Sequence, residues 1–374
     1  MNDHAPPSET TKADGSASHG NAARGVVSRR DFIKGAGGAA IALSAPFVVT
    51  RARAATQVVC RNPGGAYGDA LQAAYYDPFT KATGIEVVGV PASAGKLLAM
   101  VQSGNTEIDV ADITELTALV LERKDALVPL KYDDWKFGKV AEIAKVRRPN
   151  MVGSCWTANV ICYNTDVFKG ENHPKSCVDL WNVTKFPGPR MLQSMQAGFP
   201  ELEFALLADG VPKDKLYPID VQRAFKSLSR IKKNVAKFYD TGGVQVDMLT
   251  TKEAVCGSAY NGRIDVGQKK GAPVAVEWNE ANNQLQVQCI LKGSKNQDNA
   301  QRFIDFIMQP SAQATFAKYI PYGPTNREAF KLMSPELSRN VPNFFEDKVF
   351  YQDATWWADH RDEVEKIWNE WSLT

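Results

Sequence analysis

The sequence predicts an α/β protein made of two lobes, and three observations support this. Short β-branched segments alternate with amphipathic segments between residues 57 and 123, and the alternation restarts after Pro149. The 320 residues from Ala55 to Thr374 are also more than one domain usually holds. Repeated strand–helix units are typical of a largely parallel sheet covered by helices.

The first half is expected to contain three strands, each followed by a helix. In the first helix, Leu71, Ala74, Tyr75 and Phe79 fall on one face, and Gly84 is a stop signal. The expected order is strand Gln57–Arg61, helix Gly68–Thr83, strand Ile85–Val90, helix Lys96–Gln102, strand Asp109–Ile113 and helix Leu116–Arg123.

The second half repeats this pattern with shorter strands. Its expected strands are Thr157–Tyr163, Val235–Phe238, Ala254–Gly257, Val274–Glu277 and Val287–Ile290, with a polar loop at Trp278–Asn283 between the last two. Its expected helices are Glu201–Ala208, Val221–Ile231, Val244–Leu249, Ala300–Met308, Ala312–Tyr319 and a Trp-rich final helix, Trp357–Trp371. Pro310 should separate the two helices that flank it, because proline interrupts a helix.

Residues 1–54 have the pattern of a cleaved leader. The run Ser28–Lys34 contains the pair Arg29 and Arg30 and is followed by a mildly apolar stretch, which together resemble a bacterial twin-arginine signal. Ala52-Arg53-Ala54 suggests cleavage after Ala54. We therefore expect a periplasmic protein that meets the twin-arginine translocase and signal peptidase. A weak transmembrane helix is the alternative, but the apolar run is short for one.

The composition of the remaining chain excludes some partners. With 37 basic and 38 acidic residues after the leader, it carries no charge excess that would favour nucleic acid or an anionic membrane. Its six cysteines permit disulfides in an oxidising compartment, although buried free thiols are an equal alternative in a chain of this length. Cys60 follows Val58-Val59, which makes it a poor lipoprotein acceptor.

The sequence lacks the usual catalytic and metal-binding patterns. Only His173 and His360 follow the leader, with no metal-ligand spacing around them, and no nucleophile elbow or phosphate-binding lysine motif is present. We expect no enzyme, no metal and no cofactor, with a secreted enzyme as the least favoured alternative.

A glycine-rich turn is the sharpest local signal for binding. Asn62–Asp69 lies between the first strand and the first helix, where Gly64 and Gly65 allow backbone N–H groups to face an anion and Tyr67 supplies an aromatic wall. An ordinary turn capped by Asp69 is the alternative.

Further candidates follow other strands. Thr114 comes after the third strand, where parallel sheets bind ligands, or is a helix N-cap. Tyr260 follows a later strand in the same way. Trp278 and Tyr322 are aromatic residues in or near loops, a type of side chain that suits methylene chains and cations.

Several runs occur in the same order as in one known family. They are Gly64–Tyr67, Tyr76–Ile85, Asp179–Trp181, Phe186–Gly188, Glu203–Gly210, Tyr260–Arg263, Gly271–Val274, Ile320–Asn326 and Trp356–Val364. In these runs the chain resembles bacterial extracellular solute-binding proteins of the spermidine/putrescine type, over nearly its whole length after the leader.

The resemblance implies a two-lobed, type II-like periplasmic binding protein fold with two chain crossings. The lobes would be 55–156 plus 284–321, and 157–283 plus 322–374, closing on one small molecule. The protein would be a monomer that delivers its solute to the permease subunits of an ABC importer. The resemblance also implies ligand contacts from Tyr67, Thr114, Tyr260, Tyr322 and Gln352.

The chain departs from polyamine binders where they carry acidic residues. The segment Met195–Pro200 has none and Glu201 stands only after it, while Gln284–Gln288 replaces a Trp and an Asp. Because a buried ammonium needs acceptors, we expect either a polyamine-like or other small amine, or a zwitterionic or anionic solute such as an amino-acid derivative or opine. A long polyamine should not be the best ligand.

Overall fold

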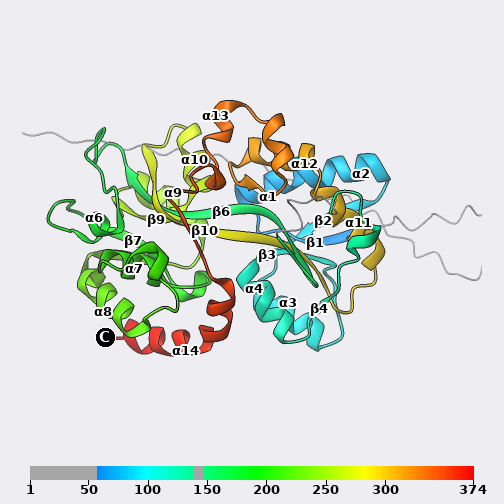
Figure 1. Ribbon diagram of the computed structural model, residues 1–374, viewed down its shortest axis with the longest axis horizontal. Helices are drawn as coiled ribbons and strands as arrows, with labels where there is room; N and C mark the ends of the chain where they lie inside the picture. The colour runs from blue at the N-terminus through cyan, green and yellow to red at the C-terminus, as the bar shows by residue number, and fades with distance from the viewer. Residues whose placement is uncertain (1–56, 139–145) are drawn as a thin grey trace, which may run out of the picture. The chain divides into compact units, whose positions relative to one another are not determined.

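Two long antiparallel strands form the centre of the sheet in this computed structural model, which describes residues 57–138 and 146–374. Strand β6 (Met151–Asn164) pairs with β10 (Val274–Leu291), and the two run side by side in Figure 1. The sheet order is β2-β1-β3-β10-β6-β9-β7-β8. The central pair therefore joins one group of strands to the other.

The first group is a parallel sheet flanked by helices. It contains β1 (Gln57–Arg61), β2 (Glu86–Val90) and β3 (Val110–Thr114), with β1 parallel to both neighbours. The helix expected after β1 is divided into α1 (Gly65–Leu71), a π-helical segment (Gln72–Tyr76) and α2 (Asp77–Thr83). It ends at Gly84, whose φ of 72° is left-handed and suits glycine. Helices α3 (Ala94–Gln102) and α4 (Glu115–Arg123) follow β2 and β3.

The second group is also parallel apart from its join to the central pair. Strand β7 (Arg190–Gln193) lies parallel to β8 (Val235–Tyr239) and to β9 (Cys256–Tyr260), while β9 is antiparallel to β6. The helices of this half are α6 (Cys177–Trp181), α7 (Leu202–Ala208), α8 (Val221–Ile231), α9 (Gln245–Thr250) and α10 (Asn261–Lys269).

The helices and short strands after β10 pack against both groups of strands. Helices α11 (Gln297–Ile307) and α12 (Pro310–Tyr319) join the first group, and Pro310 begins α12 as expected. Short elements follow: β11 (Gly323–Pro324), α13 (Pro335–Ser338) and β12 (Phe350–Tyr351). The last helix, α14 (Ala354–Ser372), packs with α7 and α8 and also contacts α4, where Asp359 pairs with Arg123 at 2.8 Å.

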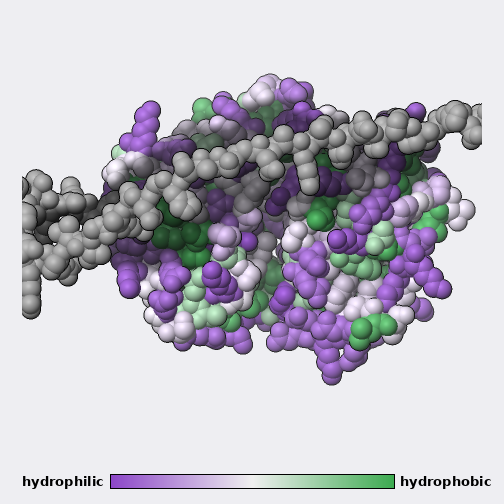
Figure 2. All heavy atoms as spheres, turned by 180° about the vertical axis from the view of Figure 1, so that it is seen from behind, coloured by the Kyte–Doolittle hydropathy of each residue, from purple (hydrophilic) through white to green (hydrophobic). Residues whose placement is uncertain are grey.

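Separate hydrophobic clusters hold these elements together. One joins α1, α2, α11 and α12 to the first group of strands, one packs α9 and α10 on the second group, and the largest covers α3, α4, α7, α8 and α14. On the face in Figure 2, outside the grey residues, hydrophilic side chains predominate and hydrophobic ones form separate patches. None of the helices in the described part of the chain is long and apolar enough to span a membrane.

All six cysteines are buried and free. Burial raises the pKa of each thiol above its ordinary value. The disulfides that the sequence permitted are therefore absent from this structure, and the alternative of buried small thiols describes it.

The main difference from the sequence prediction lies in β10. The polar segment expected as a loop, Trp278–Asn283, is part of one strand of 18 residues. Its pairing with β6 shifts between Glu277 and Asn282, and this irregularity accommodates the polar residues without ending the strand. The predicted lobe boundaries at 156 and 284 fall inside β6 and β10 and stay a prediction. The twin-arginine motif lies outside the described residues.

Candidate functional site

Two of the predicted aromatic residues lie together although they come from opposite ends of the chain. Tyr67 on α1 and Tyr322 after α12 are both buried, and their ring centroids are 5.8 Å apart. Phe316 packs edge-on against Tyr67 at 5.5 Å. Packing from α12 thus fixes both rings.

Tyr67 is also held by a buried carboxylate that the sequence did not single out as a contact. Its hydroxyl donates to Asp112 Oδ1 at 2.8 Å, and Gln286 Nε2 donates to the same oxygen at 2.9 Å. Gln288 donates to Asp112 Oδ2. Burial raises the pKa of Asp112 and these donors oppose the rise. Both carboxylate oxygens therefore already have partners.

Tyr260 and Arg263 form a second group at the start of α10. A Cβ atom placed on Gly242 would lie 2.7 Å from Arg263 Nε and 3.0 Å from a ring carbon of Tyr260. A Cβ atom on Gly65 would lie 3.6 Å from Arg263 Nη1. The arginine therefore lies beside both glycines, one in each half of the protein. Among residues 57–138 and 146–374, its guanidinium has neither a hydrogen bond nor an ion pair.

Glu201 faces the same group from the start of α7. It is 1% exposed, and Asn159 Nδ2 lies 3.3 Å from its Oε1, while Oε2 has no partner within the described residues. Burial raises the pKa of Glu201 to about 8, Ser258 opposes this, and the Glu203 carboxylate adds to it. Glu203 Oε2 is also unpartnered within the described residues, but Glu203 Oε1 accepts two hydrogen bonds, from Tyr217 and Trp357.

Tyr260 connects the two charged residues. Burial raises the pKa of its phenol to about 12, the Glu201 carboxylate adds to the rise, and the Arg263 guanidinium opposes it. The phenol of Tyr260 therefore interacts electrostatically with the Glu201 carboxylate and with the Arg263 guanidinium. The Arg263 guanidinium also opposes the rise in the pKa of Tyr322 that burial causes. Arg263 therefore lies near both Tyr260 and the Tyr67–Tyr322 pair.

Thr114 is the N-cap of α4, as the alternative interpretation of the sequence suggested. Its Oγ1 accepts from the Thr117 backbone N–H at 3.3 Å. It also pairs with Gln286 in the sheet, beside the Asp112 network. A role in ligand contact stays a prediction for this residue.

The remaining predicted residues lie apart from this group or contact it through the backbone. Trp278 stacks on Phe345 at 4.6 Å in a small separate cluster, and its predicted role in ligand contact stays a prediction. The backbone N–H of Gln352 donates to the Asn283 carbonyl at 2.9 Å. Gly65 begins α1 with Gly64 as the N-cap, so Asp69 does not cap this helix.

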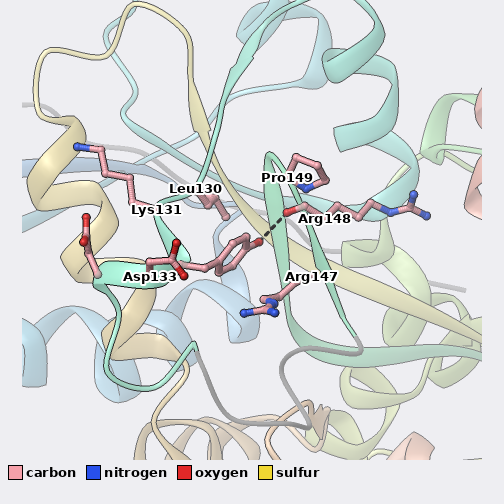
Figure 3. A pocket seen from close by; sticks show the side chains of 8 residues that line it. Leu130, Lys131, Asp133, Arg147, Arg148 and Pro149 are labelled. Carbon is pink, nitrogen blue, oxygen red and sulfur yellow. Dashed lines mark hydrogen bonds between the residues drawn. The ribbon is translucent and has the colours of Figure 1, made fainter.

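A hollow on the surface offers no better site. It has a volume of about 630 Å³ and is lined by residues 130–134 and 147–149 (Figure 3). Two of its charged residues are in ion pairs: Lys131 with Asp298 at 3.0 Å, and Arg148 with Glu115 at 2.7 Å. The Arg147 guanidinium lies over the Tyr132 ring at 4.9 Å.

The described residues contain no group of three or more His, Cys, Asp or Glu side chains able to hold a metal. Near Tyr260 they contain the Glu201 carboxylate with an unpartnered oxygen, the Arg263 guanidinium and the rings of Tyr67 and Tyr322. Sequence reasoning quoted both charged residues without assigning them. The signal that could have identified Arg263 is its place three residues after Tyr260, which puts both near one end of a helix.

Comparison with known proteins identifies the family of this chain. Residues 74–344 match the family model described as bacterial extracellular solute-binding protein. A γ-aminobutyric acid (GABA)-binding protein of Pseudomonas aeruginosa is 32% identical over 323 residues, covering 83% of this chain and 89% of that protein. The spermidine/putrescine-binding periplasmic protein of Escherichia coli is 26% identical over 201 residues, covering 53% and 54%.

Solved structures share the fold. A GABA receptor structure is 34% identical with a TM-score of 0.76, covering 84% of this chain and 97% of the other. The binding protein AgtB of A. tumefaciens, in complex with agropinic acid, is 28% identical with a TM-score of 0.76, covering 85% and 99%. The predicted periplasmic binding protein fold is thereby confirmed.

Proposed function

The chain belongs to the bacterial extracellular solute-binding proteins, and from this premise we propose that its solute is a small zwitterion with one ammonium and one carboxylate group. It is the substrate-binding component of an ABC importer and not an enzyme. GABA is the first candidate solute. The sequence left amine-like and zwitterionic solutes open, and the site favours the second class.

The observation that carries this proposal is that Arg263 lies beside Tyr260, while Glu201 contacts Asn159, the residue paired with Tyr260 across the sheet. The open oxygen of Glu201 suits an ammonium group, and the Arg263 guanidinium suits a carboxylate through charge-assisted hydrogen bonds. A solute with one charge of each sign neutralises both side chains when the site excludes water. A solute with two positive charges would leave Arg263 facing a like charge, which is unfavourable.

The relatives support the same class of solute. The proteins named for GABA align over most of their length, whereas the polyamine binder aligns over about half. Gln286 belongs to the segment Gln284–Gln288, where the resemblance implies a Trp and an Asp in polyamine binders, and its amide donates to Asp112. Both oxygens of Asp112 already accept hydrogen bonds, three in all, which makes Asp112 a poor site for a second ammonium group.

Isothermal titration calorimetry on residues 55–374 tests the proposal with three four-carbon compounds. GABA has both charges, putrescine has two ammonium groups, and butyrate has only the carboxylate. We expect GABA to bind at least about tenfold more tightly than the other two, since each loses one charge-assisted contact. Submicromolar spermidine or putrescine binding that displaces GABA and amino acids would overturn the proposal.

We also propose that the solute is bound by closure of the two lobes. The candidate residues come from both groups of strands, and a ligand drives closure when it contacts both in the closed state. Small-angle scattering should show a smaller radius of gyration with saturating GABA. An unchanged radius would count against this part of the proposal.

Export by the twin-arginine route remains our proposal for how the protein reaches the periplasm. Replacing Arg29 and Arg30 by Lys should leave the precursor in the cytoplasm, which fractionation and immunoblotting would show. Unchanged amounts of mature periplasmic protein would refute it.

A further inference from the structure

A row of buried amide side chains runs along the two central strands beside the charged residues. In the β6–β10 register, Asn282 lies opposite Asn159, and Gln284 lies opposite Thr157. Residues two apart on a strand share a face, so these side chains and Gln286 form one continuous polar strip. All of them are more than nine-tenths buried.

Part of this strip lacks hydrogen-bond partners among the described residues. Both side-chain polar atoms of Asn282, both of Gln284, and Oδ1 of Asn159 are unpartnered. Further along the same face, Gln286 and Gln288 do have partners, Asp112 and Ser154. A buried polar atom without a partner lowers the stability of the fold by about 1–3 kcal/mol. The unpartnered section of the strip therefore needs an explanation, whereas the hydrogen bonds of Gln286 and Gln288 explain the other section.

The unpartnered section adjoins the proposed solute site. Asn159 Nδ2 donates to Gln193 at 2.9 Å and lies 3.3 Å from Glu201, and Asn159 also pairs with Tyr260 across the sheet. A solute held between Glu201 and Arg263 therefore reaches the end of the strip. A carboxamide offers both donors and acceptors, which complements a hydroxyl or another carboxamide and gives a charged group no counter-ion.

We propose that Asn159, Asn282 and Gln284 form a neutral polar subsite for a hydroxyl or carboxamide group of the solute. This inference rests on the proposed function and narrows its solute class. The solute then carries, besides its ammonium and carboxylate, at least one uncharged hydrogen-bonding substituent. Water molecules bridging the amides are the competing explanation.

Calorimetry with matched probes separates the two explanations. The probes are GABA, its 2-hydroxy and 3-hydroxy derivatives, and L-glutamine as a zwitterion with a carboxamide. We expect at least one substituted probe to bind about tenfold more tightly than GABA, the gain of roughly one well-formed buried hydrogen bond.

The variant Gln284→Met removes the amide at nearly constant size. It should abolish the gain while leaving the GABA affinity within about threefold, since Glu201 and Arg263 are untouched. Gln268→Met, at an exposed position on α10, is the matched control and should change neither value. If Gln284→Met does not fold, Asn282→Leu replaces it.

The outcomes are distinct. If GABA binds and neither the hydroxyl nor the carboxamide adds affinity, the strip binds water only and this inference is overturned while the proposed function stands. If the gain persists in Gln284→Met, or disappears equally in Gln268→Met, the subsite is also refuted. If none of these zwitterions binds, the proposed function fails and this inference fails with it.

Discussion

The Glu201 carboxylate predicts how solute affinity should change with pH. Its pKa is raised to about 8, chiefly by burial, and the titratable groups near it are Glu203, Tyr239, Tyr260, Cys162 and Cys177. An ammonium group binds the ionised carboxylate, so binding must expel the proton that the free protein carries at neutral pH. With this pKa, about one Glu201 in ten is ionised at pH 7 and about nine in ten at pH 9.

The magnitude follows directly. Affinity for GABA should rise about eightfold to tenfold between pH 7 and pH 9, and binding at pH 7 should release about 0.9 proton. The solute's own ammonium group stays charged over most of this range, because its pKa is near that of Lys, about 10.4. Calorimetry in two buffers with different ionisation enthalpies measures the proton release, and titrations at half-unit steps measure the affinity.

Two variants give the prediction its control. Glu201→Gln should bind GABA weakly and with nearly constant affinity from pH 6.5 to 9, whereas Glu253→Gln, at an exposed position in the same half, should behave like the wild type. The raised pKa also destabilises the fold as pH rises from the unfolded value to about 8, by up to roughly 5 kcal/mol. The thermal midpoint of Glu201→Gln should therefore exceed the wild-type value more at pH 8 than at pH 5. A flat pH dependence in the wild type would refute the role of Glu201.

Three further changes test the other side of the site. Arg263→Gln should weaken GABA binding by roughly 10- to 100-fold, because it removes the partner of the GABA carboxylate. Putrescine has no carboxylate, so its binding should be unchanged or stronger. Equal losses for both solutes in calorimetry would contradict this. Gly242→Ala should displace the flexible Arg263 side chain and weaken GABA severalfold at an unchanged thermal midpoint, whereas Gly243→Ala, whose new Cβ meets only Thr241 at 3.8 Å, should have no effect. Tyr260→Ala should cost about 1–3 kcal/mol of binding with little loss of folding, and a wild-type affinity would remove Tyr260 from the site.

The fold was largely predictable because its local signals agree with its tertiary structure. Strand β1 and helix α8 occupy the predicted residues, and most other elements differ by a few residues at their ends. Periodicity, caps and breakers suffice for such segments. The error at Trp278–Asn283 has a different origin, because polar residues in a strand between two neighbours can be buried, and only the tertiary structure supplies the neighbours.

The site was predictable to a smaller extent. Aromatic residues after strand ends were found from position alone, and the structure brings Tyr67, Tyr260 and Tyr322 close together through shared neighbours. Glu201 and Arg263 were not assigned, since the direction of a side chain at a helix start depends on loop geometry that sequence patterns do not encode. Glu201 and Glu203 show the difficulty: they are two residues apart, both are buried and each has one unpartnered oxygen, yet Glu201 contacts Asn159 and Glu203 contacts Tyr217 and Trp357.

The six buried thiols bear on the export route that we propose for this protein. Six cysteines can pair in 15 ways, and disulfide exchange proceeds only through accessible thiolates. A chain threaded unfolded into an oxidising compartment would expose every thiol to mispairing while it folded. A chain folded beforehand in the reducing cytosol would arrive with each thiol buried and protonated. The absence of structural disulfides in this fold thus suits export after folding, which is the transport mode that the twin-arginine motif implies.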